Sequence, residues 1–230
     1  RGVLMYKKYV KRLADIVCAL AALSVFCWLY AIVALLVRIN LGSPIIFKQP
    51  RPGKDEKIFY LYKFSTMTDK RDANGNLLPD SERLTKFGKF IRATSLDELP
   101  EAINILKGDM SVVGPRPLLV RDMVFMTPEQ RKRHTVRPGL TGLAQISGRN
   151  GITWEQKLSY DLEYIEKISF FKDVKIVLLT VWSAFVKHDG ISQEGMDTAE
   201  DLGNWLLDNG VVDKEVYDAK VKEANELINV

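Results

Sequence analysis

The sequence has few of the residues and motifs on which many enzyme sites depend. Its only two cysteines, Cys18 and Cys27, lie inside one hydrophobic run, which indicates no disulfide framework and agrees with a reducing compartment. It contains no D-x-D pair for a sugar-nucleotide metal site, no H-E-x-x-H, no G-x-S-x-G and no Cys/His cluster. Walker and G-x-G-x-x-G patterns are also missing. The sequence therefore gives no sign of a zinc hydrolase, a serine hydrolase or a P-loop nucleotidase.

Charge is divided unevenly along the chain. The whole sequence carries a net charge of +4, yet acidic side chains clearly outnumber basic ones in residues 189–230. The preceding part is therefore strongly basic. A basic body with an acidic tail predicts that the body binds anionic partners, such as phospholipid, nucleotide or nucleic acid.

The run from Ile16 to Val37 contains no charged residue. At about 1.5 Å per helical residue, it is long enough to cross a hydrocarbon core. Basic residues flank it on both sides, and a simple span would place one basic cluster outside, against the positive-inside tendency. The charges thus favour a segment that enters the membrane and returns, with a kink near Ser24. The lack of any proline between Leu13 and Ser43 argues against such a break, and a buried helix of a soluble protein is the remaining alternative.

Strand and helix patterns follow one another along the rest of the chain. Residues 44–47 and 58–64 are rich in β-branched and aromatic side chains and predict a hairpin around the turn-rich stretch 49–53. Residues 69–80 read as a polar surface loop, and residues 110–113 as a strand. Amphipathic helices are expected near residues 154–168 and 174–185, the second with large apolar side chains suited to a membrane interface. We therefore expect an α+β fold.

The best candidate for acid–base or nucleophilic chemistry is the adjacent pair Asp97 and Glu98. Ser95 and Glu98 have capping-box spacing, whereas Pro100 fits better if Asp97 is itself the helix cap. Either arrangement puts two carboxylates at the positive end of a helix, which favours their ionised form. Such a carboxylate can attack phosphate, bind Mg²⁺, or do both, although ordinary helix capping explains the same pattern. Arg92, just before the helix, can hold an anion beside them.

Two further segments combine arginine with stiff or flexible backbone. Arg116 lies between Pro115 and Pro117, so its guanidinium starts from a constrained loop and suits bidentate phosphate binding. A structural proline turn with an incidental arginine is the alternative. Arg137 and Arg149 each adjoin a glycine-rich stretch whose backbone can approach a phosphate or nucleotide closely.

These segments together resemble the bacterial sugar transferases, the small monotopic phosphoglycosyl transferases, and among them the enzymes that place diacetylbacillosamine phosphate on undecaprenyl phosphate. The block Lys107-Gly-Asp-Met-Ser-Val-Val-Gly-Pro-Arg-Pro117 is the most specific. The other matching segments, in the family's order, are Phe47-Lys-Gln-Pro-Arg-Pro-Gly53, Tyr62-Lys-Phe-Ser-Thr-Met67, Arg92 through Asp97-Glu98-Leu99-Pro100, Arg137-Pro-Gly-Leu-Thr-Gly142 and Gly148-Arg-Asn150.

The resemblance implies a reaction and roles for the site residues. A UDP-sugar, expected to be an N-acetylated amino sugar, would give its sugar 1-phosphate to undecaprenyl phosphate, with UMP released, as the first membrane step of glycoconjugate synthesis. Asp97 would be the nucleophile and form a covalent phosphosugar intermediate. Glu98 would help to hold the cofactor Mg²⁺, and Arg92 and Arg116 would bind phosphate.

The resemblance also implies an organisation and a location. Residues 5–43 would form a re-entrant membrane helix region, residues 44–200 the catalytic domain, with a small hairpin or sheet and interfacial helices around the active site, and residues 201–230 an acidic helical tail. The enzyme would sit on the cytoplasmic face of the bacterial inner membrane, in contact with membrane lipid and without a nucleic-acid partner. The tail, which has no counterpart in the family, could dock on the body, on a second copy or on other pathway enzymes.

Two other functions fit parts of the sequence. A membrane-anchored basic module that binds anionic partners without catalysis would explain the charge, but it leaves Asp97-Glu98 and the Gly-Pro-Arg-Pro block unexplained. A structural membrane protein that recruits partners through its tail is the third possibility. The enzyme accounts for more of the motifs.

Overall fold

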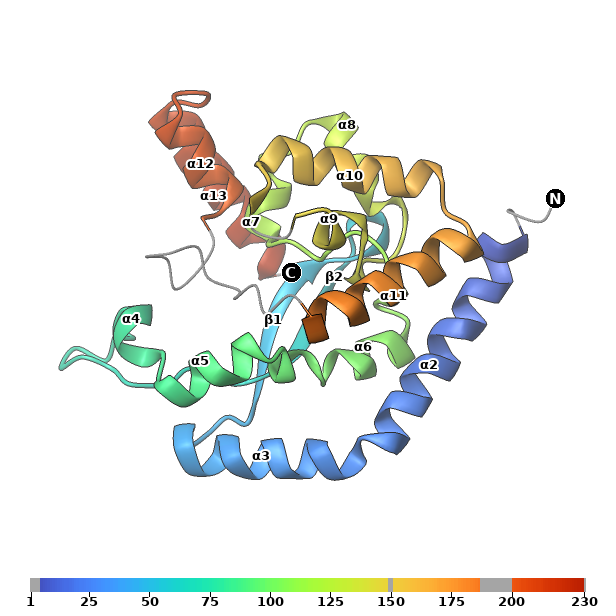
Figure 1. Cartoon of the computed structure of the whole chain (residues 1–230). Helices are drawn as coiled ribbons and strands as arrows, with labels where there is room; N and C mark the ends of the chain where they lie inside the picture. The colour runs from blue at the N-terminus through green and yellow to red at the C-terminus, as the bar shows by residue number, and fades with distance from the viewer. Residues whose placement is uncertain (1–4, 149–150, 187–199, 230) are drawn as a thin grey trace.

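The computed structural model describes residues 5–148, 151–186 and 200–229, and Figure 1 shows the course of the chain. The first half contains the π-helix η1 (Tyr6–Val10), α2 (Lys11–Val25), α3 (Cys27–Leu41), β1 (Ile46–Pro52), η2 (Lys54–Glu56), β2 (Ile58–Phe64), α4 (Asp80–Arg83), α5 (Lys86–Ala93), η3 (Leu96–Glu98), α6 (Glu101–Lys107) and β3 (Ser111–Val113). The second half contains α7 (Val120–Met123), α8 (Pro128–Arg131), η4 (Lys132–Thr135), β4 (Gly139–Thr141), α9 (Leu143–Ile146), α10 (Trp154–Glu166), α11 (Phe170–Val186), α12 (Leu202–Asp208) and α13 (Lys214–Ile228).

The fold is α+β, as the sequence predicts, with the described helices arranged around two small sheets. Strands β1 and β2 form the predicted antiparallel hairpin, in register from Ile46 opposite Phe64 to Pro52 opposite Ile58. The turn itself lies later than predicted, because β1 runs through Pro50 and Pro52 instead of ending before them. Proline is tolerated here because, in the described part of the chain, β1 pairs with β2 alone and its other edge makes no ladder.

A second sheet joins β3 to β4 in parallel, and β4 is a strand that the sequence patterns did not indicate. The segment was expected to bring its glycine-rich backbone to a phosphate. In the structure, Gly139 packs against the backbone of Gly114, and a Cβ atom on Gly139 would lie 2.0 Å from the Gly114 nitrogen. Glycine at this position therefore permits close backbone contact inside the protein.

The hydrophobic N-terminal segment is broken into two helices at Phe26, close to the predicted kink at Ser24. Helices α2 and α3 are bent by 65° relative to each other. Among the described residues, no single helix has the length and apolar character to cross a membrane; the bent pair qualifies, on length and composition alone. Whether this segment is re-entrant stays a prediction.

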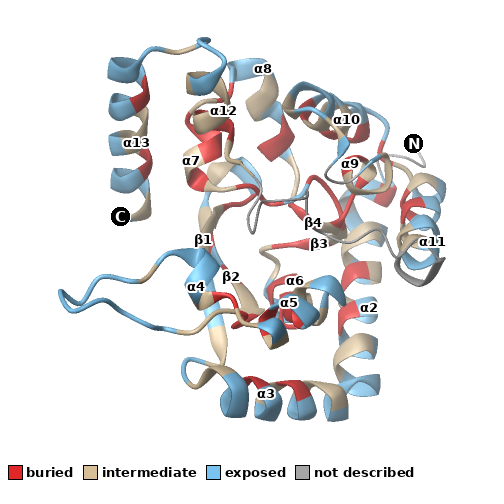
Figure 2. Cartoon of the chain, turned by 60° about the vertical axis from the view of Figure 1, so that its left-hand side comes forward, coloured by how far each residue is buried: buried red, intermediate tan, exposed pale blue. Residues whose placement is uncertain are grey.

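Packing explains how the bend forms without proline. On α2, Ala19 is buried in a cluster with Ile105 of α6, whereas on α3 Val33 and Val37 pack with Phe64 of β2. The two halves are thus held against different parts of the body, at different angles. Figure 2 shows that the buried residues of α3 face the body and that its opposite side is exposed.

Buried carboxylates also fasten the N-terminal segment to the body. Asp15 of α2 accepts hydrogen bonds from the Ser111 hydroxyl and the Val112 amide, each at 2.9 Å. Asp173 of α11 accepts hydrogen bonds from two residues near the start of the chain, Tyr6 and Lys11, at 2.7 and 2.6 Å. Polar contacts thus fix α2 next to β3 and α11.

The acidic tail docks on the body, which was one of the alternatives left open by the sequence. Leu202 of α12 is buried beside Leu118, and Ala224 of α13 is buried against α7. Asp122 of α7 accepts a hydrogen bond from the Leu202 amide at 2.9 Å. The tail is therefore a part of the folded core beside the segment that follows Pro117.

Candidate active site

The two adjacent carboxylates lie in a short 3-10 turn that leads into α6. Ser95 adopts a left-handed conformation, with φ 55°, and its side chain makes no capping bond. Helix α6 begins at Glu101 after Pro100. Neither Ser95 nor Asp97 caps α6, so both predicted caps are wrong. The 3-10 turn formed by residues 96–98 separates Ser95 from the helix, and Asp97 lies within that turn. The carboxylates nevertheless sit at the N-terminal side of α6.

Lys63 on β2 lies at the centre of three carboxylates. Its Nζ is 2.8 Å from Glu98 Oε1, 3.3 Å from Glu101 Oε1 and 3.7 Å from Asp97 Oδ2. Strand β2 and α6 are held in this register by Asn104, whose side chain accepts a bond from the Tyr62 amide and donates one to the Tyr60 carbonyl. The hairpin and α6 together thus assemble one charged cluster.

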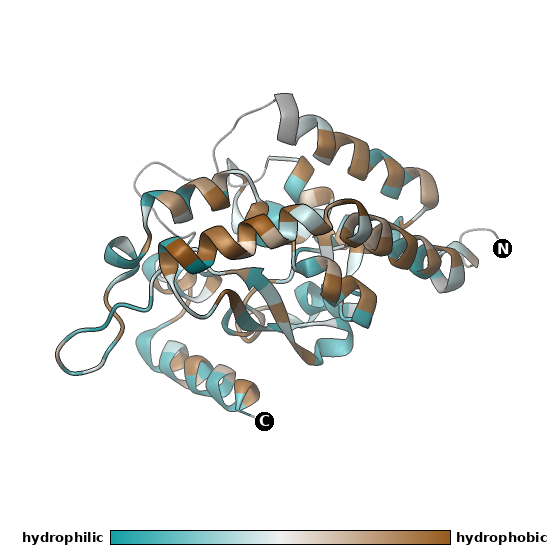
Figure 3. Cartoon of the chain, turned by 90° about the horizontal axis from the view of Figure 1, so that it is seen from below, coloured by the Kyte–Doolittle hydropathy of each residue, from teal (hydrophilic) through white to brown (hydrophobic). Residues whose placement is uncertain are grey.

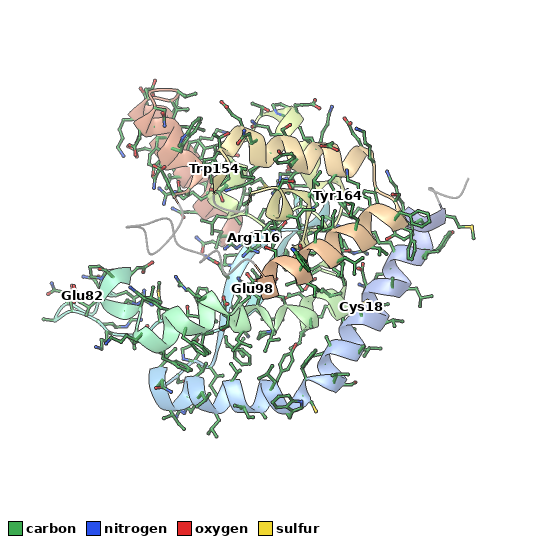
Figure 4. The ribbon with its side chains drawn as sticks, viewed as in Figure 1. Cys18, Glu82, Glu98, Arg116, Trp154 and Tyr164 are labelled. Carbon is green, nitrogen blue, oxygen red and sulfur yellow. The ribbon has the colours of Figure 1, made fainter. Side chains whose placement is uncertain are left out.

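Arg116 joins the same cluster from the loop after β3. Its Nη2 donates to Glu98 Oε1 at 2.6 Å, so Lys63 and Arg116 bind the same carboxylate oxygen. Figure 4 labels Glu98 and Arg116, which lie next to each other at the centre of the molecule. The Pro-Arg-Pro loop and the Asp97-Glu98 turn, far apart in sequence, therefore meet as the phosphate-site prediction requires.

The local electrostatics separate the carboxyl groups. Burial raises the pKa of Glu98, but Arg116 and Lys63 outweigh it and hold this pKa well below its usual range. For Asp97, burial outweighs the attraction of Lys63, and its pKa is raised. The expectation that the helix start favours ionised Asp97 is thus incomplete, because it ignored desolvation. Burial, together with the charge of Glu98, raises the pKa of Glu101 to about 7.

The structure places the other predicted phosphate ligands differently. Arg92 of α5 donates to the Thr66 hydroxyl at 2.9 Å, and its charge lowers the pKa of Asp97, against the dominant effect of burial. Arg137 instead donates to the Gly108 carbonyl at 2.7 Å, at the far end of α6 from the carboxylates. Arg149 lies outside the described residues. Of the three predicted arginine ligands among the described residues, Arg92 and Arg116 thus act on the carboxylate cluster.

The carbonyl end of α6 is held by the N-terminal segment. Arg12 of α2 donates to the carbonyls of Ile105 and Leu106 at 2.6 and 2.9 Å. These are among the carbonyls that lack helical partners at a C-terminus, and a cation there also complements the helix dipole. Helix α6 thus follows directly after the Asp97-Glu98 turn and contacts α2 at its other end.

Lys63 and Glu101 were not among the predicted site residues. Lys63 follows the buried Phe59 and Leu61 at every second position of β2, which places it on the inward face of the strand. Glu101 is three residues after Glu98 and is 2% exposed. A carboxylate at this helical spacing shares a face with the first one, a signal that the sequence did contain.

The donor set suits a magnesium ion shared with a phosphate substrate. Among the described residues, no three His, Cys, Asp or Glu side chains form a dedicated metal cage. Mg²⁺, however, commonly uses one or two carboxylates together with substrate phosphates and water. Lys63 and Arg116 both contact Oε1 of Glu98, which leaves Oε2 free for a metal within the described part of the site. The residues present therefore fit Mg²⁺.

Comparison with known proteins identifies the family. The profile of the bacterial sugar transferase family matches residues 6–187. The chain belongs to the bacterial sugar transferase family. This transferase carries residues 188–230, including α12 and α13, beyond the matched region.

Several relatives give the match more detail. The transferase is 51% identical to the sugar transferase EpsL of Bacillus subtilis over 83% of this chain and 94% of EpsL. It is 42% identical to the galactosyl transferase CpsE of Streptococcus agalactiae, over 74% of this chain and 41% of CpsE. It is 40% identical to the UDP-glucose:undecaprenyl-phosphate glucose-1-phosphate transferase of Escherichia coli, over 78% of this chain and 41% of that protein. The match thus spans about two-fifths of the length of the last two.

Proposed function

We propose that this transferase moves a sugar 1-phosphate from a UDP-sugar to undecaprenyl phosphate, producing undecaprenyl diphosphate sugar and UMP. The names of relatives such as the Escherichia coli transferase support these substrates. The observation that carries the proposal is the cluster in which Lys63 and Arg116 meet Asp97 and Glu98. Carboxylates paired with cations at a helix start suit chemistry on a phosphate group.

The proposed reaction has two displacements at one phosphorus atom. An Asp97 carboxylate oxygen forms a bond to the phosphorus that bears the sugar, while the bond from that phosphorus to the bridging oxygen breaks and UMP leaves with the electron pair. A phosphate oxygen of undecaprenyl phosphate then attacks the same phosphorus and releases the Asp97 carboxylate. The intermediate separates two phosphate substrates that would otherwise bring several negative charges together.

The neighbouring residues have distinct roles in this scheme. Lys63 stabilises the ionised form of Asp97 against the effect of burial. Arg116 and Arg92 bind the oxygens of the transferred phosphate by charge-assisted hydrogen bonds. Glu98 would hold Mg²⁺, which would supply positive charge to the diphosphate of the donor substrate. A module that merely binds anions would have no need for two acidic residues in its basic site.

The identity of the sugar on the UDP donor is a separate part of the proposal. The resemblance to the diacetylbacillosamine phosphate transferases favours an N-acetylated amino sugar, whereas relatives are named for galactose and glucose. UMP release with a panel of UDP-N-acetylated amino sugars, UDP-glucose and UDP-galactose separates these donors. We expect the amino sugars to react fastest, and a preference for UDP-glucose would overturn this assignment.

We further propose that the enzyme lies on the cytoplasmic face of the bacterial inner membrane, with α2 and α3 dipping into it. Helix α3 exposes apolar side chains, among them Trp28, Leu35 and Ile39, and α11 exposes Phe171 and Trp182. Figure 3 shows the apolar stretch of α3 crossing the underside of the molecule. A label near Tyr6 should react only from the cytoplasm. Labelling from the periplasm would mean that the segment spans the membrane.

The intermediate is tested by mass spectrometry of enzyme quenched with UDP-sugar and Mg²⁺ but without the lipid. The wild type should release UMP and carry a phosphosugar on Asp97. Asp97→Asn should keep its fold, yet show neither adduct nor turnover. An adduct on Glu98, or UMP release that strictly requires the lipid phosphate, would refute the scheme.

A further inference from the structure

The backbone that carries Arg116 is gripped from two sides by arginines of other elements. Arg133 of η4 donates through Nη2 to the Arg116 carbonyl at 2.6 Å. Arg51 of β1 donates through Nη1 to the next carbonyl, that of Pro117, at 3.2 Å. Two consecutive peptide oxygens are therefore fixed by two guanidinium groups.

Arg133 is itself held rigidly. Its Nε and Nη2 donate to Asp161 Oδ2 of α10 at 2.9 and 2.7 Å, and the side chains of both residues are 2% exposed. A buried ion pair is weak evidence of a contribution to stability, because desolvation opposes the attraction. Its retention in the interior calls for another reason, and the bond to the Arg116 carbonyl supplies one.

The neighbouring arginine of the same basic run provides a contrast. Arg131 forms an ion pair with Glu56 whose two side chains are each about one-third exposed. None of the hydrogen bonds or ion pairs of Arg131 within the described residues reaches the Arg116 loop. Residues 131–137 form one basic run in the sequence, but its arginines have different contacts in the structure. Arg131 lies at the surface, whereas Arg133 is buried and holds the Arg116 loop.

We propose that Arg133 and Asp161 are positioning residues for Arg116. Pro115 and Pro117 restrict the dihedral angles around Arg116, including the ψ angle of Arg116 itself, but they do not attach the loop to the rest of the protein. The bond from Arg133 anchors the Arg116 carbonyl to η4 and α10, and it thereby fixes the direction in which the Arg116 side chain leaves the loop toward Glu98. This inference rests on the proposed function, in which Arg116 binds the transferred phosphate.

The first test is the substitution Arg133→Lys, which keeps the charge but loses the fork that contacts Asp161 and the carbonyl together. We expect a loss of about tenfold or more in kcat/KM for UMP release. The matched control Arg131→Lys makes the same change two residues away and should stay within about twofold of wild type.

A double-mutant cycle with Arg116→Ala then separates positioning from general destabilisation. If Arg133 acts through Arg116, Arg133→Lys should have almost no further effect in the Arg116→Ala background. If the activity losses of the two single variants multiply in the double variant, the proposal is wrong. Wild-type activity in Arg133→Lys would also overturn it.

A second variant keeps the test decisive if a lone substitution fails to fold. Arg133→Met with Asp161→Leu removes both charges, and an apolar replacement of a buried pair usually preserves folding. This double variant should keep a wild-type melting transition but lose activity. The loss should again disappear in the Arg116→Ala background. Full activity in it would reject the inference. If the wild type itself releases no UMP from any UDP-sugar, the proposed function has failed instead.

Discussion

Removal of the charge on Lys63 tests the electrostatic logic of the site most directly. The Nζ of Lys63 lies 3.7 Å from Asp97 Oδ2, and burial already raises the pKa of this carboxyl. An opposite charge within 4–6 Å ordinarily lowers a carboxyl pKa by about 1–3 units. Lys63→Met should therefore raise the pKa of Asp97 further, because the attraction that opposes the effect of burial is removed.

The assay is the pH profile of single-turnover UMP release. In the proposed mechanism the attacking carboxylate must be ionised, so activity is lost as the pH falls through the pKa of Asp97. The acid limb of the Lys63→Met profile should lie at least about one unit above that of the wild type, with activity recovering at alkaline pH. Lys107→Met is a matched control, since Lys107 contacts Tyr62 and Asp109 rather than the three carboxylates.

The titration of Glu101 also affects the pH profile, and a second substitution removes this contribution. Its pKa is raised to about 7, and without Lys63 it competes for the same proton. The double variant Lys63→Met with Glu101→Gln leaves Asp97 as the group that sets the limb. An equal loss of activity at every pH, with the limb unmoved in both variants, would refute the assigned role of Lys63.

Three further predictions follow from the same contacts. Arg116→Ala loses a charge-assisted hydrogen bond to phosphate worth about 1.5–3 kcal/mol, so activity should fall at least tenfold in a protein whose circular dichroism is unchanged. Burial, followed by the charge of Arg133, lowers the pKa of His134 to about 4. The unfolded chain thus takes up this proton first as pH falls from 6.5 to 4, which removes about 2–3 kcal/mol of stability; urea titrations of His134→Gln should show a smaller loss in this window. Truncation after Glu200 removes the buried Leu202 and Ala224, and calorimetry should find a melting temperature lower by at least about 5 °C. An unchanged transition would mean that the tail adds nothing to the core.

Motifs with local causes were predicted well from the sequence. The hairpin and the helices near residues 154–168 and 174–185 follow from side-chain periodicity, which needs no knowledge of the rest of the chain. The convergence of Asp97-Glu98 and Arg116 was predicted through the family resemblance, and the structure brings Glu98 and Arg116 to 2.6 Å.

Features set by long-range packing were not predictable in this way. A kink was predicted near Ser24 from the flanking charges, but its position at Phe26 and its cause, the attachment of α2 and α3 to different neighbours, have no local mark in the sequence. Arg133 reads as one more basic residue in a surface run until Asp161 of a distant helix is placed against it. The raised pKa of Asp97 depends on burial, which a helix-start argument cannot supply.

Helix α6 is a rigid spacer of fixed length, here called the strut, between the N-terminal segment and the Asp97-Glu98 carboxylates. Arg12 of α2 grips its carbonyl end, and the carboxylates lie just before its other end. Its seven residues measure about 10 Å, at 1.5 Å per residue. If α2 rests in a bilayer, this strut sets the height above it at which phosphate is transferred. One inserted residue would lengthen the strut only slightly, but it would turn Asp97 by about 100° around the helix axis relative to Arg12. The height of the proposed reaction and the orientation of the proposed nucleophile are therefore both set by the number of residues in α6.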